Sequence, residues 1–270
     1  DVDQLPPPVK AIAAFLEKPF LLDATVEVKA AADDDDTGGV NMMIVGSGGD
    51  SKEFTGRLEI ARTDKGDLAM VSRGRLPRTA VLDTGDRRVI QTLADDDAVS
   101  ITRTADELRA LLSMTDFGRA ALNAEWAQSN AKTKGHALWT ATLPVRFLKH
   151  AQSADGIRGI GKSKPQSLRA VIETNAAGAV MSLEFRIGRS DPMRSLRADV
   201  SRKARETLES GGTLDSSGLT MSGEDLAALE DDQTESAWTV YKLAPKPGGP
   251  SKRLQKTIEI LRSALAHDDE

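Results

Sequence analysis

Cysteine is absent from the chain of 270 residues. Its absence excludes disulfides, thiolate nucleophiles and cysteine-ligated zinc or iron–sulfur sites. Histidine is scarce too: His136, His150 and His267 lie far apart in sequence, and none is close to another metal ligand or an obvious nucleophile. We therefore expect no metal site, no cofactor and no catalytic residue, and an enzyme is disfavoured.

Long apolar runs and a strong net charge are also lacking. No run approaches the ~18 consecutive apolar residues that a membrane-spanning helix needs. The chain has 36 Lys and Arg against 41 Asp and Glu, a net charge of −5, whereas a nucleic-acid-binding domain is normally strongly basic. With 39% apolar and 29% charged residues, a chain of this length can bury a sizeable core. We expect a globular protein with no nucleic-acid partner.

Short segments of alternating apolar and polar residues make up much of the sequence. They recur at roughly ten-residue spacing and are separated by Gly- and Asp-rich turns, which is typical of an antiparallel meander. The segments expected as strands are 25–28, 42–45, 57–61, 68–72, 79–83, 89–93, 99–101, 137–143, 168–174, 180–187 and 238–243.

Helical periodicity occurs in five places, one of which is a short acidic helix at Glu224–Glu230. A short amphipathic helix near the N-terminus ends before Pro19. A middle helical segment opens at Thr104, with Glu107 completing a capping box, and continues through a second piece toward Trp126. Asp191 begins a long helix, and Ser251 caps a terminal one.

One motif has the pattern of a nucleotide-binding P-loop. Gly156–Ser163 spells G-x-x-x-x-G-K-S, in which backbone amides and the lysine would hold phosphates. That chemistry needs a buried strand before the motif and a helix after it. Here a polar segment precedes it, and an alternating, strand-like pattern follows Pro165. A loop rich in glycine and lysine is favoured, and a P-loop nucleotide binder stays a remote alternative.

The helix expected after Asp191 is basic. A basic amphipathic helix can bind an anionic membrane surface or an acidic protein partner. The simpler reading is a solvated face with i,i+4 ion pairs, such as Asp199–Lys203. The arginines that would make such a contact are Arg194, Arg197, Arg202 and Arg205.

Several segments, taken in order, resemble the LolA-like family of bacterial periplasmic lipoprotein carriers. Gly56–Arg62 is similar to the family's strand of form G-x-L-x-hydrophobic-x-Arg, and Thr79–Val89 is similar to its hairpin with an Asp-Gly turn. The helices within 104–122 stand where the family has its lid helices, and 168–187 resembles its later hairpin. The resemblance implies a periplasmic or otherwise extracytoplasmic bacterial protein, and it places Arg62 where the family has an arginine of its lid-closing interactions.

The fold we expect is therefore α+β: a strongly curved antiparallel sheet, or half-barrel, with helices covering its concave face. We expect a single domain over residues 1–270. Its half-barrel core comprises 20–187 plus 235–244, with a helical insertion at 191–233 and a C-terminal helix at 251–267.

A half-barrel needs apolar material against its concave face, and either helices or an acyl chain can supply it. One hypothesis is a non-catalytic carrier or sensor that binds a lipid or a lipidated, apolar partner in this groove. The other is an interaction or envelope-assembly module whose groove is filled by its own helices. Together with Arg62, the candidate ligand-binding residues are Leu58, Ile60, Leu68, Met70, Val81, Val89, Leu183 and Phe185.

Overall fold

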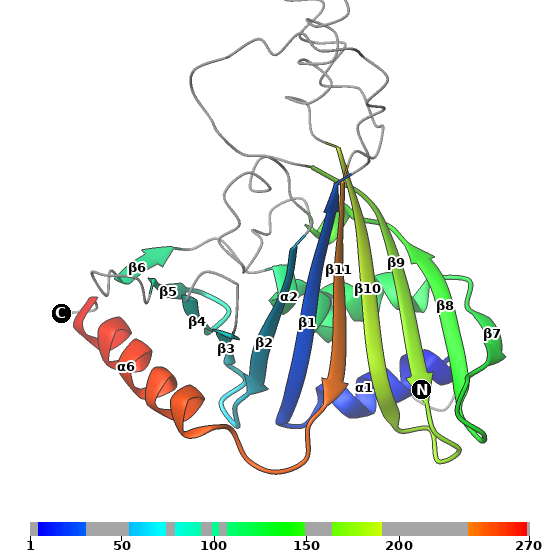
Figure 1. Ribbon diagram of the computed structural model, residues 1–270, viewed down its shortest axis with the longest axis horizontal. Helices are drawn as coiled ribbons and strands as arrows, with labels where there is room; N and C mark the ends of the chain where they lie inside the picture. Colours follow the sequence, from blue (N-terminus) through cyan, green and yellow to red (C-terminus); the bar gives the residue numbers. More distant parts are fainter. Residues whose placement is uncertain are drawn as a thin grey trace, which may run out of the picture.

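The computed structural model describes residues 5–30, 54–73, 79–92, 99–102, 107–148, 164–190 and 237–268. These residues form one sheet of eleven strands in the order β6-β5-β4-β3-β2-β1-β11-β10-β9-β8-β7 (Figure 1). Neighbouring strands all pair antiparallel, which confirms the expected α+β class. The strands are β1 Phe20–Ala30, β2 Phe54–Arg62, β3 Leu68–Arg73, β4 Thr79–Asp83, β5 Arg88–Thr92, β6 Val99–Thr102, β7 Ala127–Asn130, β8 Ala137–Leu143, β9 Lys164–Thr174, β10 Val180–Ser190 and β11 Ala237–Pro245.

The last strand in sequence lies in the middle of the sheet. β11 pairs with β1 on one side, where Lys242 is opposite Thr25, and with β10 on the other, where Tyr241 is opposite Phe185. It thereby joins two meanders, one running from β1 to β6 and the other from β7 to β10.

The described helices are short except at the C-terminus. Their bounds are α1 Pro7–Leu16, α2 Glu107–Leu111, the π-helical turn η2 Met114–Gly118, α3 Arg119–Leu122, the 3-10 turn η3 Arg146–Leu148 and α6 Lys252–Asp268. The middle helical segment is thus present but broken, because Ser113 adopts extended backbone and its Oγ accepts a hydrogen bond from the amide of Thr115. Trp126 lies beyond this segment, and its indole N–H donates to the carbonyl of Ala121.

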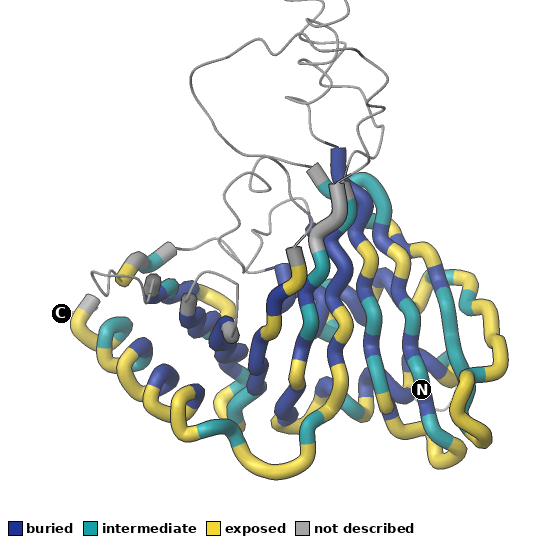
Figure 2. Tube along the Cα trace, in the orientation of Figure 1, coloured by how far each residue is buried: buried dark blue, intermediate teal, exposed yellow. Residues whose placement is uncertain are grey.

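Helices cover both faces of the sheet. One face packs against α1, α2, η2 and α3 and forms the larger apolar core; we call it the concave face. The opposite, outer face of β3, β4 and β5 packs against α6 and forms a second core around Leu254, Ile258 and Leu261 (Figures 1 and 2). The expected half-barrel with helices on its concave face and a helical C-terminal extension is confirmed.

Polar contacts fix α6 against the sheet at two points. Ser251 caps the helix, since its Oγ accepts from the amide of Leu254 at 3.2 Å, and the same hydroxyl donates to the buried carboxylate of Glu59 at 2.6 Å. Further along, the guanidinium of Arg262 lies 2.7 Å from the carboxylate of Asp67. Both carboxylates come from the β2–β3 hairpin, so this hairpin positions the whole helix.

Some expectations concern segments outside the described residues. The strand expected at 42–45, the Gly156–Ser163 loop and the basic helix with Arg194, Arg197, Arg202 and Arg205 all lie there. The single-domain organisation with its insertion at 191–233 therefore stays a prediction.

Candidate functional site: an enclosed apolar face

Most of the expected ligand-binding residues converge on the concave face. Side chains alternate between the two faces of a strand, so apolar residues two apart on β2, β3 and β10 point the same way. All of these residues belong to the larger core and are buried: Leu58, Ile60, Leu68, Met70, Val81, Leu183 and Phe185.

Val89 was expected in this set and is not part of it. It pairs with Leu82 in the β4–β5 hairpin, and both side chains belong to the second core beneath α6. The residue of β5 on the concave side is Ile90, which lies opposite Val81 and packs on the larger core. The error is one of strand parity: Val89 and Ile90 are both apolar, and only the hairpin register decides which of them faces inward.

The concave face is closed by the protein's own helices. Leu183 and Phe185 are 2% and 1% exposed, and the ring of Phe117 from η2 meets that of Phe185 edge to face, with centroids 5.1 Å apart. Helix α1 adds Val9, Ile12 and Leu16 to the same core. The surface proposed to meet a ligand is therefore covered by side chains.

Arg62 lies at the edge of this region. It is half-buried at the end of β2, and its guanidinium donates a hydrogen bond to the carbonyl of Leu16, in the last turn of α1. Carbonyls at a helix C-terminus lack partners within the helix, and a cation there is favourable. The contact thus joins the end of α1 to the sheet.

A buried polar cluster, absent from the sequence-based expectations, joins α2 to the centre of the sheet. The carboxylate of Glu107, 1% exposed, accepts hydrogen bonds from the guanidinium of Arg189 on β10 and from the hydroxyl of Tyr241 on β11, the latter at 2.8 Å. Arg189 also donates to the hydroxyl of Thr239. We call Glu107, Arg189 and Tyr241 the central latch.

A second contact holds the same helix to the β4–β5 hairpin. Arg109 lies 3.2 Å from the carboxylate of Asp83 and donates to its backbone carbonyl at 2.9 Å. Its guanidinium also lies against Gly85, where a Cβ atom would be only 2.7 Å away. We call this contact the lateral latch. Because β4 is separated from β11 by three strands, α2 bridges the concave face between the two latches.

Sequence reasoning missed both latches for an identifiable reason. Glu107 fits a capping box with Thr104, a local pattern that accounts for a glutamate without any tertiary partner. In the structure its carboxylate contacts residues 82 and 134 positions away. The available signal was Arg189, which continues the alternating inward row of Leu183, Phe185 and Ile187 and is therefore a buried charge that needs a partner.

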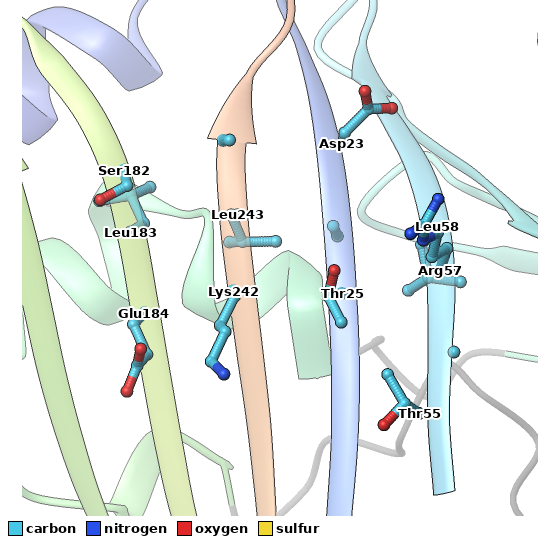
Figure 3. Close-up of a pocket in the computed structure, with 13 residues that line it drawn as sticks. Asp23, Thr25, Thr55, Arg57, Leu58, Ser182, Leu183, Glu184, Lys242 and Leu243 are labelled. Carbon is cyan, nitrogen blue, oxygen red and sulfur yellow. The ribbon is translucent and has the colours of Figure 1, made fainter.

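The outer face of the sheet carries an open groove of about 890 Å³ across β10, β11, β1 and β2. Figure 3 shows Glu184, Lys242, Thr25 and Arg57 side by side on these strands. A hydrogen bond of 2.6 Å to Glu27 raises the pKa of Lys242. Charged side chains of both signs line this groove, together with the buried leucines Leu58, Leu183 and Leu243.

The described residues bring together no group of three or more side chains suited to a metal ion. Among the helices described, none is both long enough and apolar enough to span a membrane.

Comparisons with known proteins add a weak structural likeness. No family model matches the sequence, and no curated protein matches it. A solved structure that does match is the crystal structure of a LolA superfamily protein from Nitrosomonas europaea; the match covers 90% of this chain and 97% of that chain.

The likeness is to this LolA superfamily protein and is weak. The two chains share 8% sequence identity, and the TM-score is 0.31. At these values the LolA-like match agrees with the expected resemblance but adds nothing about ligand or partner.

Proposed function

We propose that this protein is a non-catalytic carrier or sensor that binds a lipid, or a lipidated or other apolar partner, on the concave face of its sheet. The proposal rests on one observation: a large apolar surface is covered at its centre by very short helices. Its apolar surface spans strands from β4 to β9, yet its central cover consists of α2, η2 and α3, each four or five residues long.

Helices of this length are not stable alone and depend on tertiary packing. Among the described residues, the ion pairs that hold these helices to the sheet are those of the two latches, both made by α2. When the latches separate, the three short helices can leave the sheet together, and the apolar surface becomes accessible. An acyl chain would then replace the apolar contacts that Phe117 and its neighbours now make with Phe185.

The compartment belongs to the same proposal. A carrier of apolar cargo is needed where cargo crosses an aqueous space between membranes, and we propose an extracytoplasmic location in a bacterium. No catalytic step is assigned to it.

Absence of cysteine makes the proposal directly testable. Leu183 and Glu184 are consecutive on β10, but Leu183 faces the enclosed core and Glu184 faces the outer groove. In Leu183→Cys, a thiol reagent should react only when the helices leave the sheet, and a bound long-chain fatty acid should slow the reaction further. In the matched control Glu184→Cys, the reaction should be fast and unaffected by fatty acid.

Native mass spectrometry of protein purified from cells is the complementary measurement. A co-purified lipid that is lost in unfolded protein would support the carrier. A bare polypeptide mass, together with labelling of Leu183→Cys that no fatty acid changes, would refute it.

The second candidate is an interaction or envelope-assembly module with a self-filled groove. The dense packing around Phe117 and Phe185 favours it, since every expected lining residue on the concave face is already covered. It predicts that neither lipid nor fatty acid is found by the two measurements above, so the same experiments separate the candidates. The P-loop alternative would require nucleotide-dependent thermal stabilisation that Lys162→Ala abolishes.

A further inference from the structure

We propose that one rim of the sheet docks on the surface of an anionic membrane. This rim is the end at which β2, β9 and β11 finish and at which β1, β3, β8 and β10 begin; it lies at the bottom of Figure 1. We call it the basal rim. It consists of the loops 17–19, 63–67, 131–136, 175–179 and 246–251 and the first turn of α6.

The charge of the basal rim is opposite to that of the whole chain. The chain carries a net charge of −5, whereas the exposed carboxylates of the rim are only Glu17 and Asp64. Its exposed cations are Lys18, Lys65, Lys132, Lys134, Lys252 and Arg253. Among the described residues, no ion pair involves any of these six cations.

The distribution of these cations indicates what they would bind. They come from four separate segments and do not converge on one point, and five of the six are lysines. A single phosphate or carboxylate is best held by convergent, bidentate arginine, whereas scattered lysines suit many headgroups on a fluid surface. Each lysine or arginine that lies near an anionic membrane surface adds to the attraction, whether or not the cations converge.

An apolar element lies on the same rim. A shallow cavity of about 550 Å³ is lined by Phe15, Pro19, Phe20 and Ile258. The rings of Phe15 and Phe20 stack with centroids 5.1 Å apart, and Phe15 remains half-exposed. Arg62 and Lys246 line the cavity as well, so apolar and cationic side chains alternate there. Such alternation suits the boundary between headgroups and acyl chains.

The proposal is independent of what the concave face binds. Membrane docking is measured with vesicles, and cargo binding is measured by thiol protection and native mass spectrometry. A negative result for one proposal therefore does not affect the test of the other. The basal rim also differs from the basic helix expected after Asp191, which lies outside the described residues.

The test is co-sedimentation of the full chain with vesicles. We expect binding to phosphatidylcholine vesicles that contain about 30% phosphatidylglycerol, and no binding to phosphatidylcholine alone. Raising the salt concentration from about 0.05 M to about 0.5 M should release most of the protein, because exposed charges are screened.

Two double variants decide whether the rim is responsible. Lys132→Glu with Lys134→Glu changes only an exposed loop of the rim, and it should lower partitioning to the anionic vesicles at least about tenfold. Arg57→Glu with Arg169→Glu makes the same charge change at exposed positions on β2 and β9, within the strands and away from the rim, and should leave most of the binding. Circular dichroism verifies that both variants fold.

Four results would overturn the proposal. One is the absence of binding to anionic vesicles at low salt. Another is binding that the rim variant leaves unchanged, and the third is an equal loss in both variants. Salt-sensitive capture of an acidic protein without vesicle binding would also overturn it, and would assign the rim to a protein partner.

Discussion

At the scale of single residues, the charges buried inside the protein are its most sensitive positions. Glu107 and Arg189 are 1% and 5% exposed at their side chains, so each compensates the charge of the other in a region shielded from solvent. Tyr241, fully buried, adds a hydrogen bond to the same carboxylate. The two groups of the ion pair contribute to stability only together.

Glu107→Ala should therefore be strongly destabilising. It leaves the guanidinium of Arg189 buried without its carboxylate, a change that typically costs about 3–5 kcal/mol. Tyr241→Phe removes one hydrogen bond to a charged group and should cost about 1–3 kcal/mol. Chemical denaturation measures both values. Similar losses below about 1 kcal/mol in both variants would show that the central latch contributes little.

Two glycines provide a matched test of the lateral latch. Gly85 and Gly178 both lie in hairpin turns with positive φ, +99° and +77°, so alanine is strained at either position. At Gly178 a Cβ meets nothing within 4 Å, whereas at Gly85 it would be 2.7 Å from the guanidinium of Arg109. Gly178→Ala should cost about 1–2 kcal/mol from backbone strain alone.

Gly85→Ala should lower the free energy of unfolding by more than Gly178→Ala, because it also displaces Arg109 from Asp83. In the background of Arg109→Ala the excess should disappear, since no guanidinium is left to displace. Equal costs for the two glycine variants in the natural background would contradict the contact.

At the scale of residues, the sequence predicted which residues are buried better than it predicted the face of the sheet to which each one points. Apolar alternation was sufficient to select Leu58 and Phe185 as inward residues, because their outward neighbours Arg57, Glu59, Glu184 and Arg186 are polar. Alternation was insufficient at Val89 and Ile90. These two consecutive residues are both apolar, and each packs on a different face of the sheet, because helices cover both faces.

At the scale of elements, the cover of the concave face differs from the strands beneath it. The cover is divided into α2, η2 and α3, with an extended residue, Ser113, between the first two. The strands β1, β10 and β11 are each paired on both sides over most of their length. Local unfolding free energies follow such differences in packing and hydrogen bonding.

Native-state hydrogen exchange should therefore show two classes of amides. Those of α2, η2 and α3 should exchange through a partial opening, with free energies below that of global unfolding. Those in the middle of β10 and β11 should exchange only on global unfolding. Exchange of both sets at one common free energy, measured by nuclear magnetic resonance, would mean that the cover never moves separately.

The sequence predicted the helices at the two ends of the chain more accurately than the one in the middle. Pro19 and Ser251 are local stop and start signals, and the helices end and begin close to them. The middle segment has leucines at helical spacing on both sides of Ser113, and its break becomes apparent only from packing on the sheet. Strand β7, four exposed residues without an apolar stripe, has no sequence signal of its own.

At the scale of the whole molecule, the protein has three distinct surfaces: two apolar surfaces of the sheet, each covered by helices, and the basic basal rim. The larger apolar surface is enclosed by short helices, the smaller by one long helix, and the cations gather where the loops of one end meet. Composition and periodicity predicted the antiparallel sheet and its helices. They could not predict the position of β11, because strand pairing over more than 180 residues leaves no local pattern.

That position of β11 has a consequence for the order of events in synthesis. The strands of residues 20–102 and those of residues 127–190 can each form a meander early, but each exposes the edge of β1 or β10 until residues 237–245 arrive. Nearly nine-tenths of the chain must leave the ribosome before one continuous sheet exists, and contacts between distant residues form slowly. Until then the unpaired edges can pair with other chains. A nascent chain therefore keeps the edges of β1 and β10 unpaired until its final tenth is made, and chaperones can bind these edges during that time.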